Sequence, residues 1–193
     1  MINLVILILV PALAAGPSEA TVDRGYGSKG FRVGFMSPVS RSMGEVDRLM
    51  AVDLVYQYDA GYGFVSARSG VRAGGGLNFD GTDAMDFAIL DLKAGKYFSR
   101  QALSPFVSAG AGIHWVRIRQ TSMDEDRIFD YSDDGAGICL TAGTGFTAMR
   151  TSSFQLQLEL DYFIVLEKIG SENVTKEYPR GILFTLCLKK GGR

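Results

Sequence analysis

The feature that most constrains this sequence is an unbroken alternation of apolar and polar residues from Phe154 to Tyr162. The segment reads FQLQLELDY, with Phe, Leu or Tyr at every even position and Gln, Glu or Asp at every odd one. Successive side chains of a β-strand point to opposite faces, so the segment predicts a strand with one apolar and one polar face. A soluble sandwich turns such an apolar face toward a shared core, whereas a membrane barrel turns it toward lipid.

Seven other segments repeat this alternation less regularly. The composition suits many strands joined by tight turns, since 24 residues are glycine, 11% are aromatic and only five are proline. Connections after the second, fourth and sixth segments are short and the others are longer, as in membrane barrels. We therefore predict an all-β fold, an eight-stranded antiparallel up-and-down transmembrane β-barrel, with a soluble lipocalin-like barrel as the alternative. The predicted strands are residues 31–37, 49–58, 62–73, 86–98, 103–120, 135–149, 154–162 and 181–188.

The first 15 residues, MINLVILILVPALAA, form an apolar run that is too short to cross a bilayer as a helix. Small residues follow it, so we predict a signal peptide over residues 1–20 with cleavage after Ala20, and Ala14 as the other candidate position. A buried N-terminal strand is the alternative. The remaining predicted regions are an N-terminal segment (21–30), the barrel (31–188) and a basic tail (189–193).

If the apolar face is outside, the polar face of each strand lines the barrel interior. An eight-stranded barrel is just wide enough for side chains to fill it, so charged residues there are expected to form a hydrogen-bonded ionic plug. A narrow ion path is the functional alternative, whereas a wide pore is excluded by the strand number. The predicted lumenal residues are Arg32, Asp53, Arg68, Arg72, Asp91, Lys93, Glu159 and Asp161.

His114 is the only histidine, so any chemistry that needs an imidazole must use it. Ser108, a possible nucleophile on the same strand, lies six residues away, roughly 20 Å at ~3.3 Å per residue. We therefore expect a hydrogen-bonded lumenal imidazole, and only a loop residue such as Ser122 would support an enzyme. Cys139 and Cys187 have lumenal parity but are predicted at opposite rims, so we expect two free thiols. No cofactor or metal site is predicted.

The predicted connection at residues 121–134 is strongly acidic. It is expected to be solvated, or to serve as a contact surface whose carboxylates reach anionic lipopolysaccharide through divalent cations. Arg117 and Arg119, just below it, are candidates for direct contact with lipid phosphates. The acidic residues are Asp124, Glu125, Asp126, Asp130, Asp133 and Asp134.

Three segments carry a resemblance to known proteins: LSPFVSAGAGIHW (103–115), GAGICLTAGTGF (135–146) and FQLQLELDY (154–162). With them the chain resembles the eight-stranded outer-membrane β-barrel families of Gram-negative bacteria, the group of the OmpA transmembrane domain, OmpX and OmpW. The resemblance implies export to the bacterial outer membrane, among its lipids and lipopolysaccharide.

The near balance of 20 basic and 21 acidic residues gives no indication of a nucleic-acid partner. We expect a monomeric, non-catalytic barrel with an envelope-structural or surface-contact role. A narrow channel and a lipid-modifying enzyme are the alternatives.

Overall fold

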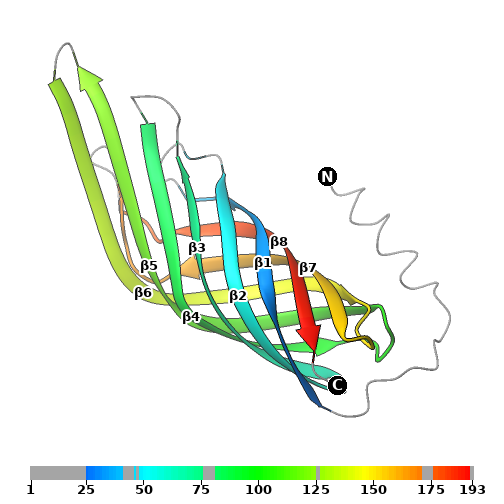
Figure 1. Ribbon diagram of the computed structural model, residues 1–193. Coiled ribbons are helices and arrows are strands. Elements are labelled where there is room, and N and C mark those ends of the chain that lie inside the picture. Colours follow the sequence, from blue (N-terminus) through cyan, green and yellow to red (C-terminus); the bar gives the residue numbers. More distant parts are fainter. Residues whose placement is uncertain are drawn as a thin grey trace.

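The computed structural model describes residues 25–40, 46, 48–75, 81–124, 127–170 and 176–191, so the predicted signal peptide lies outside the described residues. Eight antiparallel strands, each paired with its neighbours in sequence, close into one barrel through β8 and β1 (Figure 1). The predicted eight-stranded up-and-down barrel is confirmed. The strands are β1 (Tyr26–Pro38), β2 (Leu49–Ala60), β3 (Gly63–Gly75), β4 (Gly81–Tyr97), β5 (Ser104–Asp124), β6 (Arg127–Ala148), β7 (Phe154–Val165) and β8 (Arg180–Gly191).

Burial in this barrel is inverted relative to a soluble protein. Along β2 every second residue is buried, and the outward residue Leu54 is 72% exposed whereas its inward neighbour Asp53 is 1% exposed. On β7, Leu160 is exposed and Glu159 is buried. Apolar residues outside and charged residues inside match a barrel that faces lipid, and they exclude the soluble alternative with its leucines in a dry centre.

Among the described residues, no helix has the length and apolar character needed to cross a membrane.

The barrel begins earlier and ends later than predicted. β1 starts at Tyr26, which pairs with Asp59 of β2, so half of the predicted N-terminal segment belongs to the barrel. β8 continues to Gly191, and Lys189 points into the lumen, where its Nζ donates to Gln157 Oε1 at 2.6 Å. The predicted basic tail is therefore partly strand. Lys189 was expected to be in water, but it finds a hydrogen-bond acceptor inside the barrel.

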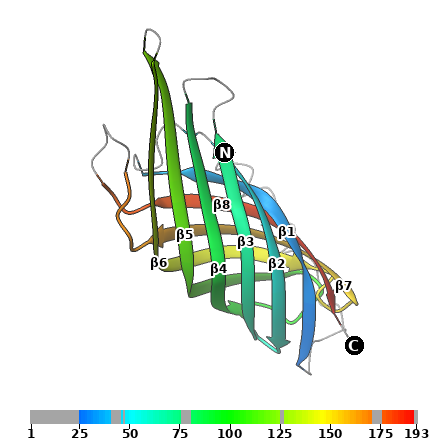
Figure 2. The same cartoon turned by 60° about the vertical axis from the view of Figure 1, so that its left-hand side comes forward.

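The predicted acidic connection at 121–134 is also mostly strand. β5 and β6 pair without interruption until Asp124 meets Arg127, and only two residues separate the two strands. The ladder continues here because Ile128, Phe129 and Tyr131 have high β-propensity among the acidic residues. Figures 1 and 2 show this hairpin rising well beyond the rest of the barrel, with the start of β4 beside it.

A β-bulge in β4 reverses the alternation of its side chains. With Asp91 and Lys93 inside, a regular strand over 86–98 would place Ala88 outside, but Ala88 is fully buried, and the register of β4 against β5 shifts between Ala88 and Leu90. Ile89 and Leu90 are consecutive and both exposed, as one extra residue in a strand requires. The bulge turns Asp86 into the lumen together with Asp91.

Candidate functional site: the charged interior

The interior of the barrel is filled in three layers. The end that carries the long β5–β6 hairpin holds a buried apolar cluster, and the end with the short turns holds three packed aromatic rings. A layer of charged side chains lies between them. The apolar cluster contains Met36, Val46, Leu49, Ala51, Ala84, Val116, Ile118, Cys139, Phe163, Val165, Ile169 and Leu183, and the aromatic rings are Phe64, Tyr97 and Phe106.

The structure brings together all eight charged residues predicted for the lumen, and each is at most 4% exposed. On one side of the charged layer, Arg32 of β1 crosses the lumen. Its Nε donates to Asp53 Oδ2 at 2.8 Å, and its Nη1 donates to Glu159 at 3.0 Å and Asp161 at 3.3 Å. One guanidinium thus links the paired strands β1 and β2 to β7, which comes near β1 only because the barrel closes through β8.

Lys93 and Arg68 hold the same pair of carboxylates from the opposite side. Lys93 Nζ lies 2.5 Å from both Glu159 and Asp161. Arg68 Nη1 donates to Asp161 at 3.1 Å, and its Nη2 donates to Asp91 at 3.3 Å. Buried charges are tolerated only when they are paired and hydrogen-bonded, and each of these has at least one oppositely charged partner.

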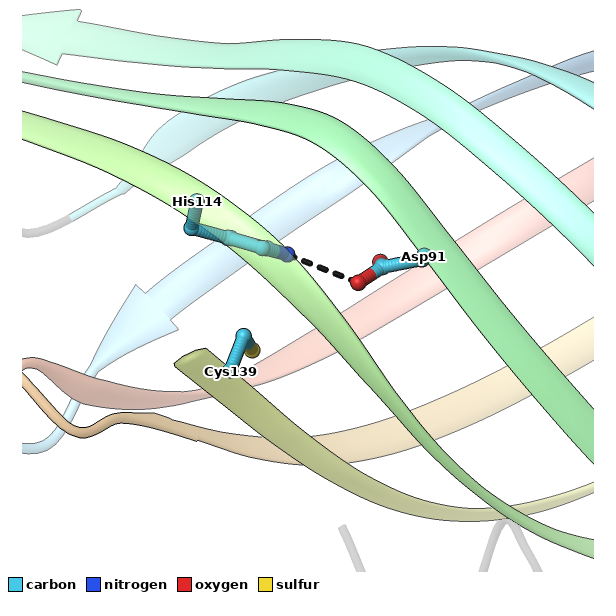
Figure 3. Close-up of side chains that lie close together, drawn as sticks. All are labelled: Asp91, His114 and Cys139. Carbon is cyan, nitrogen blue, oxygen red and sulfur yellow. Dashed lines mark hydrogen bonds and ion pairs between the residues drawn. The ribbon is translucent and has the colours of Figure 1, made fainter. Parts of the chain in front are cut away.

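His114 and Asp86 complete the layer. His114 Nδ1 is 2.7 Å from Asp86 Oδ1. On the other side of the ring, Nε2 is 2.9 Å from Asp91 Oδ1, the contact that Figure 3 shows. The expectation of a hydrogen-bonded lumenal imidazole is confirmed. Ionised carboxylates only accept hydrogen bonds, so an imidazole that bonds both of them carries a proton on each nitrogen and a positive charge. Arg72 shares Asp86 with the imidazole through Oδ2 at 2.9 Å, with its Nη1 3.3 Å from Nδ1.

A second polar group lies near the short turns, and sequence reasoning missed two of its members, Asp59 and Arg150, which it assigned to turns. Tyr97 donates its hydroxyl hydrogen to Asp59 at 2.7 Å, and Gln57 donates to both. The guanidinium of Arg150 lies 3.6 Å from the centroid of the Tyr97 ring and donates to the carbonyls of Ser99 and Gly61. Arg150 comes from a turn between strands, so the alternation pattern could not assign it to the interior.

The two cysteines are free and buried, as predicted. Cys139 of β6 faces the charged layer from the apolar side. Among the described residues, one group of side chains has donor atoms close enough to hold a metal ion: one atom each of Asp91, His114 and Cys139, all within 4.8 Å of one another (Figure 3).

The predicted acidic residues do not form one loop cluster. Asp124 and Asp130 belong to β5 and β6, and Glu125 and Asp126 lie outside the described residues. Asp134 accepts a hydrogen bond from Trp115 Nε1 at 3.0 Å. Its neighbour Asp133 points to the other face of β6, toward the β7–β8 connection.

Asp133 holds the β7–β8 connection against the protruding hairpin. Its carboxylate accepts from Lys176 Nζ at 3.0 Å and from the Gly170 amide at 3.1 Å. Partial desolvation acts to raise the pKa of Asp133, but the hydrogen bonds from Lys176 and Gly170 outweigh it and hold this pKa below the usual range of aspartate. This ion pair lies on the part of β6 beyond the barrel rim.

No protein-family model and no curated protein matches this sequence. Solved barrels do share its fold. Neisserial surface protein A is 10% identical, with a TM-score of 0.56 over 86% of this chain and 96% of that one. The attachment invasion locus protein Ail of Yersinia pestis is 12% identical, with a TM-score of 0.53 over 89% and 100%. Ail has also been solved with the heparin analogue sucrose octasulfate, at 13% identity and a TM-score of 0.50 over 87% and 97%.

At these identities the likeness concerns the fold alone. Together with the inverted burial, it defines the class: this chain has the architecture of the eight-stranded outer-membrane β-barrels.

Proposed function

We propose that this chain is a non-catalytic, monomeric barrel of the bacterial outer membrane that acts through its protruding hairpin as a surface-contact protein. The observation that carries the proposal is the combination of a filled lumen with a sheet that continues far beyond it. Because the interior of the barrel is filled, its function has to be carried by its exposed surfaces.

Pairs of cations and aromatic rings at both ends of the barrel support a position within a bilayer. Aromatic and basic residues mark the two interfaces of membrane proteins, and a cation over a ring adds attraction there. At the hairpin end the pairs are Arg48 with Phe35 and Lys168 with Tyr178; at the short-turn end they are Arg100 with Tyr62 and Lys190 with Phe154.

The hairpin offers an open sheet edge for contact. Among the described residues, the ladder between β6 and β7 ends at the pair Cys139 and Val165. One further backbone hydrogen bond follows it, from Leu166 N to Ile138 O. From Asp133 to Gly137 the β7–β8 connection lies against β6. The open edge is therefore the backbone of β6 from Arg127 to Ser132, to which an extended partner segment can add as a strand.

The charge of the hairpin selects the kind of partner. Residues 117–134 contain six acidic and three basic residues, a net charge of 3 − 6 = −3. We therefore infer a cationic partner segment, in contrast to the polysulfated ligand in the Ail complex. Arg117 and Arg119 are exposed on the outer face of β5, where they suit lipopolysaccharide phosphates.

The alternatives find less support. A conducting path has to pass both the apolar cluster and the aromatic rings as well as the paired charges between them. A lipid-modifying enzyme needs a free imidazole nitrogen as general base, whereas both nitrogens of His114 are bound to carboxylates.

A protease site inserted between β5 and β6 tests the orientation and exposure of the hairpin. In intact Gram-negative cells, added protease should cut this site but not a matched site in the short turn 151–153. Cells with the full hairpin should also bind a polylysine surface more strongly than cells in which residues 120–131 are replaced by Asn-Gly. Cleavage at the short turn alone, or equal binding by both cell types, would contradict the proposal.

A further inference from the structure

A row of three residues crosses neighbouring strands below His114. In the strand register, Asp91 of β4 pairs with Gly112 of β5, and Gly112 pairs with Cys139 of β6. A carboxylate and a thiol therefore flank a residue without a side chain. His114 lies two residues further along β5 on the same inward face, and its ring reaches toward Asp91 (Figure 3).

Glycine at position 112 keeps this space open. A Cβ there would lie 1.9 Å from Asp91 Oδ1, which is also the oxygen bonded to His114 Nε2. The neighbours of His114 across the strands are small as well, Ala88 on β4 and Gly137 on β6. The oxygen, nitrogen and sulfur donors thus converge on a space that any larger residue at 112 would fill.

Residues next to the donors are arranged as in known metal sites, where neighbouring side chains orient the ligands through hydrogen bonds. Histidines that bind metals usually donate their other ring N–H to a carboxylate, and Asp86 accepts from Nδ1 in this way. Asp91 uses Oδ2 to accept from Arg68 at 3.3 Å, which leaves Oδ1 directed at His114. The nitrogen and oxygen donors are thereby each oriented by a second contact.

The charge of the layer also accommodates a divalent ion. Four cations (Arg32, Arg68, Arg72 and Lys93) face five carboxylates (Asp53, Asp86, Asp91, Glu159 and Asp161), a sum of 4 − 5 = −1 without His114. An imidazolium contributes +1. A divalent ion bound by neutral His114 and a Cys139 thiolate contributes 2 − 1 = +1, so the layer stays neutral in either state.

We propose that Asp91, His114 and Cys139 form a buried site for one zinc-class divalent ion. Mixed nitrogen, oxygen and thiolate ligands suit Zn²⁺ or Co²⁺ in tetrahedral geometry, with water in the fourth position. Binding replaces the proton on His114 Nε2 and the thiol proton of Cys139, so two protons leave for each ion that enters. The buried apolar residues that cover the site, among them Phe163 and Val165, favour entry of the ion before the barrel closes.

Refolding in the presence of Co²⁺ tests this site directly. The full-length chain is refolded from urea into detergent micelles with one equivalent of Co²⁺, and its fold is verified by the gel shift between heated and unheated samples. We expect the visible bands of tetrahedral cobalt and a thiolate-to-cobalt charge-transfer band, both abolished by one equivalent of Zn²⁺. The matched variants are Cys139→Ser, which should lose the charge-transfer band, and Cys187→Ser, which should retain it.

X-ray absorption of the zinc-loaded wild type keeps the test independent of whether the variants fold. The site predicts one sulfur at ~2.3 Å and nitrogen or oxygen ligands at ~2.0–2.2 Å. Folded wild type without a charge-transfer band, a band that disappears in Cys187→Ser, or a zinc shell without sulfur would each overturn the proposal. The test does not depend on the proposed surface role, because the cobalt and zinc spectra report only on ligands inside the barrel.

Discussion

Asp86 and Asp91 stand five positions apart on β4, and yet both carboxylates bind the same imidazole, one at each nitrogen of His114. In a regular strand, residues separated by an odd number face opposite sides of the sheet. The extra residue at Ile89 reverses the alternation between them and turns both inward. A local irregularity of one strand therefore builds the centre of the charged interior.

Removing the imidazole should destabilise the barrel. In His114→Phe, two carboxylates lose their shared cation, and breaking such a buried pair costs about 3–5 kcal/mol of unfolding free energy. The further change Asp86→Asn removes one surplus negative charge, so it should restore part of the loss even though the same change destabilises the wild type. Urea unfolding in detergent measures both. Additive effects of the two substitutions would contradict the coupling between His114 and Asp86.

Two glycine substitutions should differ sharply in their effect. An added Cβ at Gly112 meets the Asp91 carboxylate at 1.9 Å and the Leu90 carbonyl at 2.5 Å, so Gly112→Ala should lower the unfolding free energy by about 1–3 kcal/mol. At Gly63 the nearest atom is 3.6 Å away, and Gly63→Ala should be close to neutral. Equal effects would show that the crowding at Gly112 relaxes without cost.

The filled lumen should not conduct. Reconstituted in a planar lipid bilayer, the wild-type protein is expected to give no discrete current steps, because apolar and aromatic side chains close the interior at the two ends of the charged layer. Arg68→Ala and Glu159→Gln serve as controls. Steps in the wild type whose size changes with either substitution would establish the ion path instead.

The contact between the hairpin and the β7–β8 connection should depend on pH. The pKa of Asp133 is lowered in the folded protein, so its ion pair with Lys176 is fully present above the ordinary aspartate pKa and is lost as the pH falls through the lowered value. The Gly170 amide resonance, read by NMR in micelles, should titrate with a midpoint below 3.8 and stop titrating in Asp133→Asn. A midpoint above 3.8 would mean that the contact does not form.

The alternation of apolar and polar residues was sufficient to predict the number of strands, their order and the side that faces outward. It failed at the bulge in β4 and in the β5–β6 hairpin, whose structures do not depend on alternation. Ile89 and Leu90 belong to a run of four apolar residues, 87–90, and this break in the alternation is the trace of the bulge in the sequence. The hairpin looked like a loop because its strands are stabilised by each other rather than by a buried face.

The charged layer was only partly predictable for a related reason. Parity identified nine of its members, His114 included, but Asp86 has the opposite parity until the bulge is known. Lys189 looked like part of a basic tail because its acceptor, Gln157, lies on a neighbouring strand. Asp91, His114 and Cys139 come from three strands, and only the lateral register of those strands brings them together.

Fluorescence quenching by lipid tests the orientation of the barrel most directly. Trp115 is the only tryptophan, so Trp115→Phe combined with Leu54→Trp places a single reporter at an outward position that is 72% exposed. In vesicles with brominated acyl chains, we expect strong quenching of this reporter and little effect of aqueous acrylamide. Quenching by acrylamide without quenching by the brominated lipid would place Leu54 in water and contradict the membrane barrel.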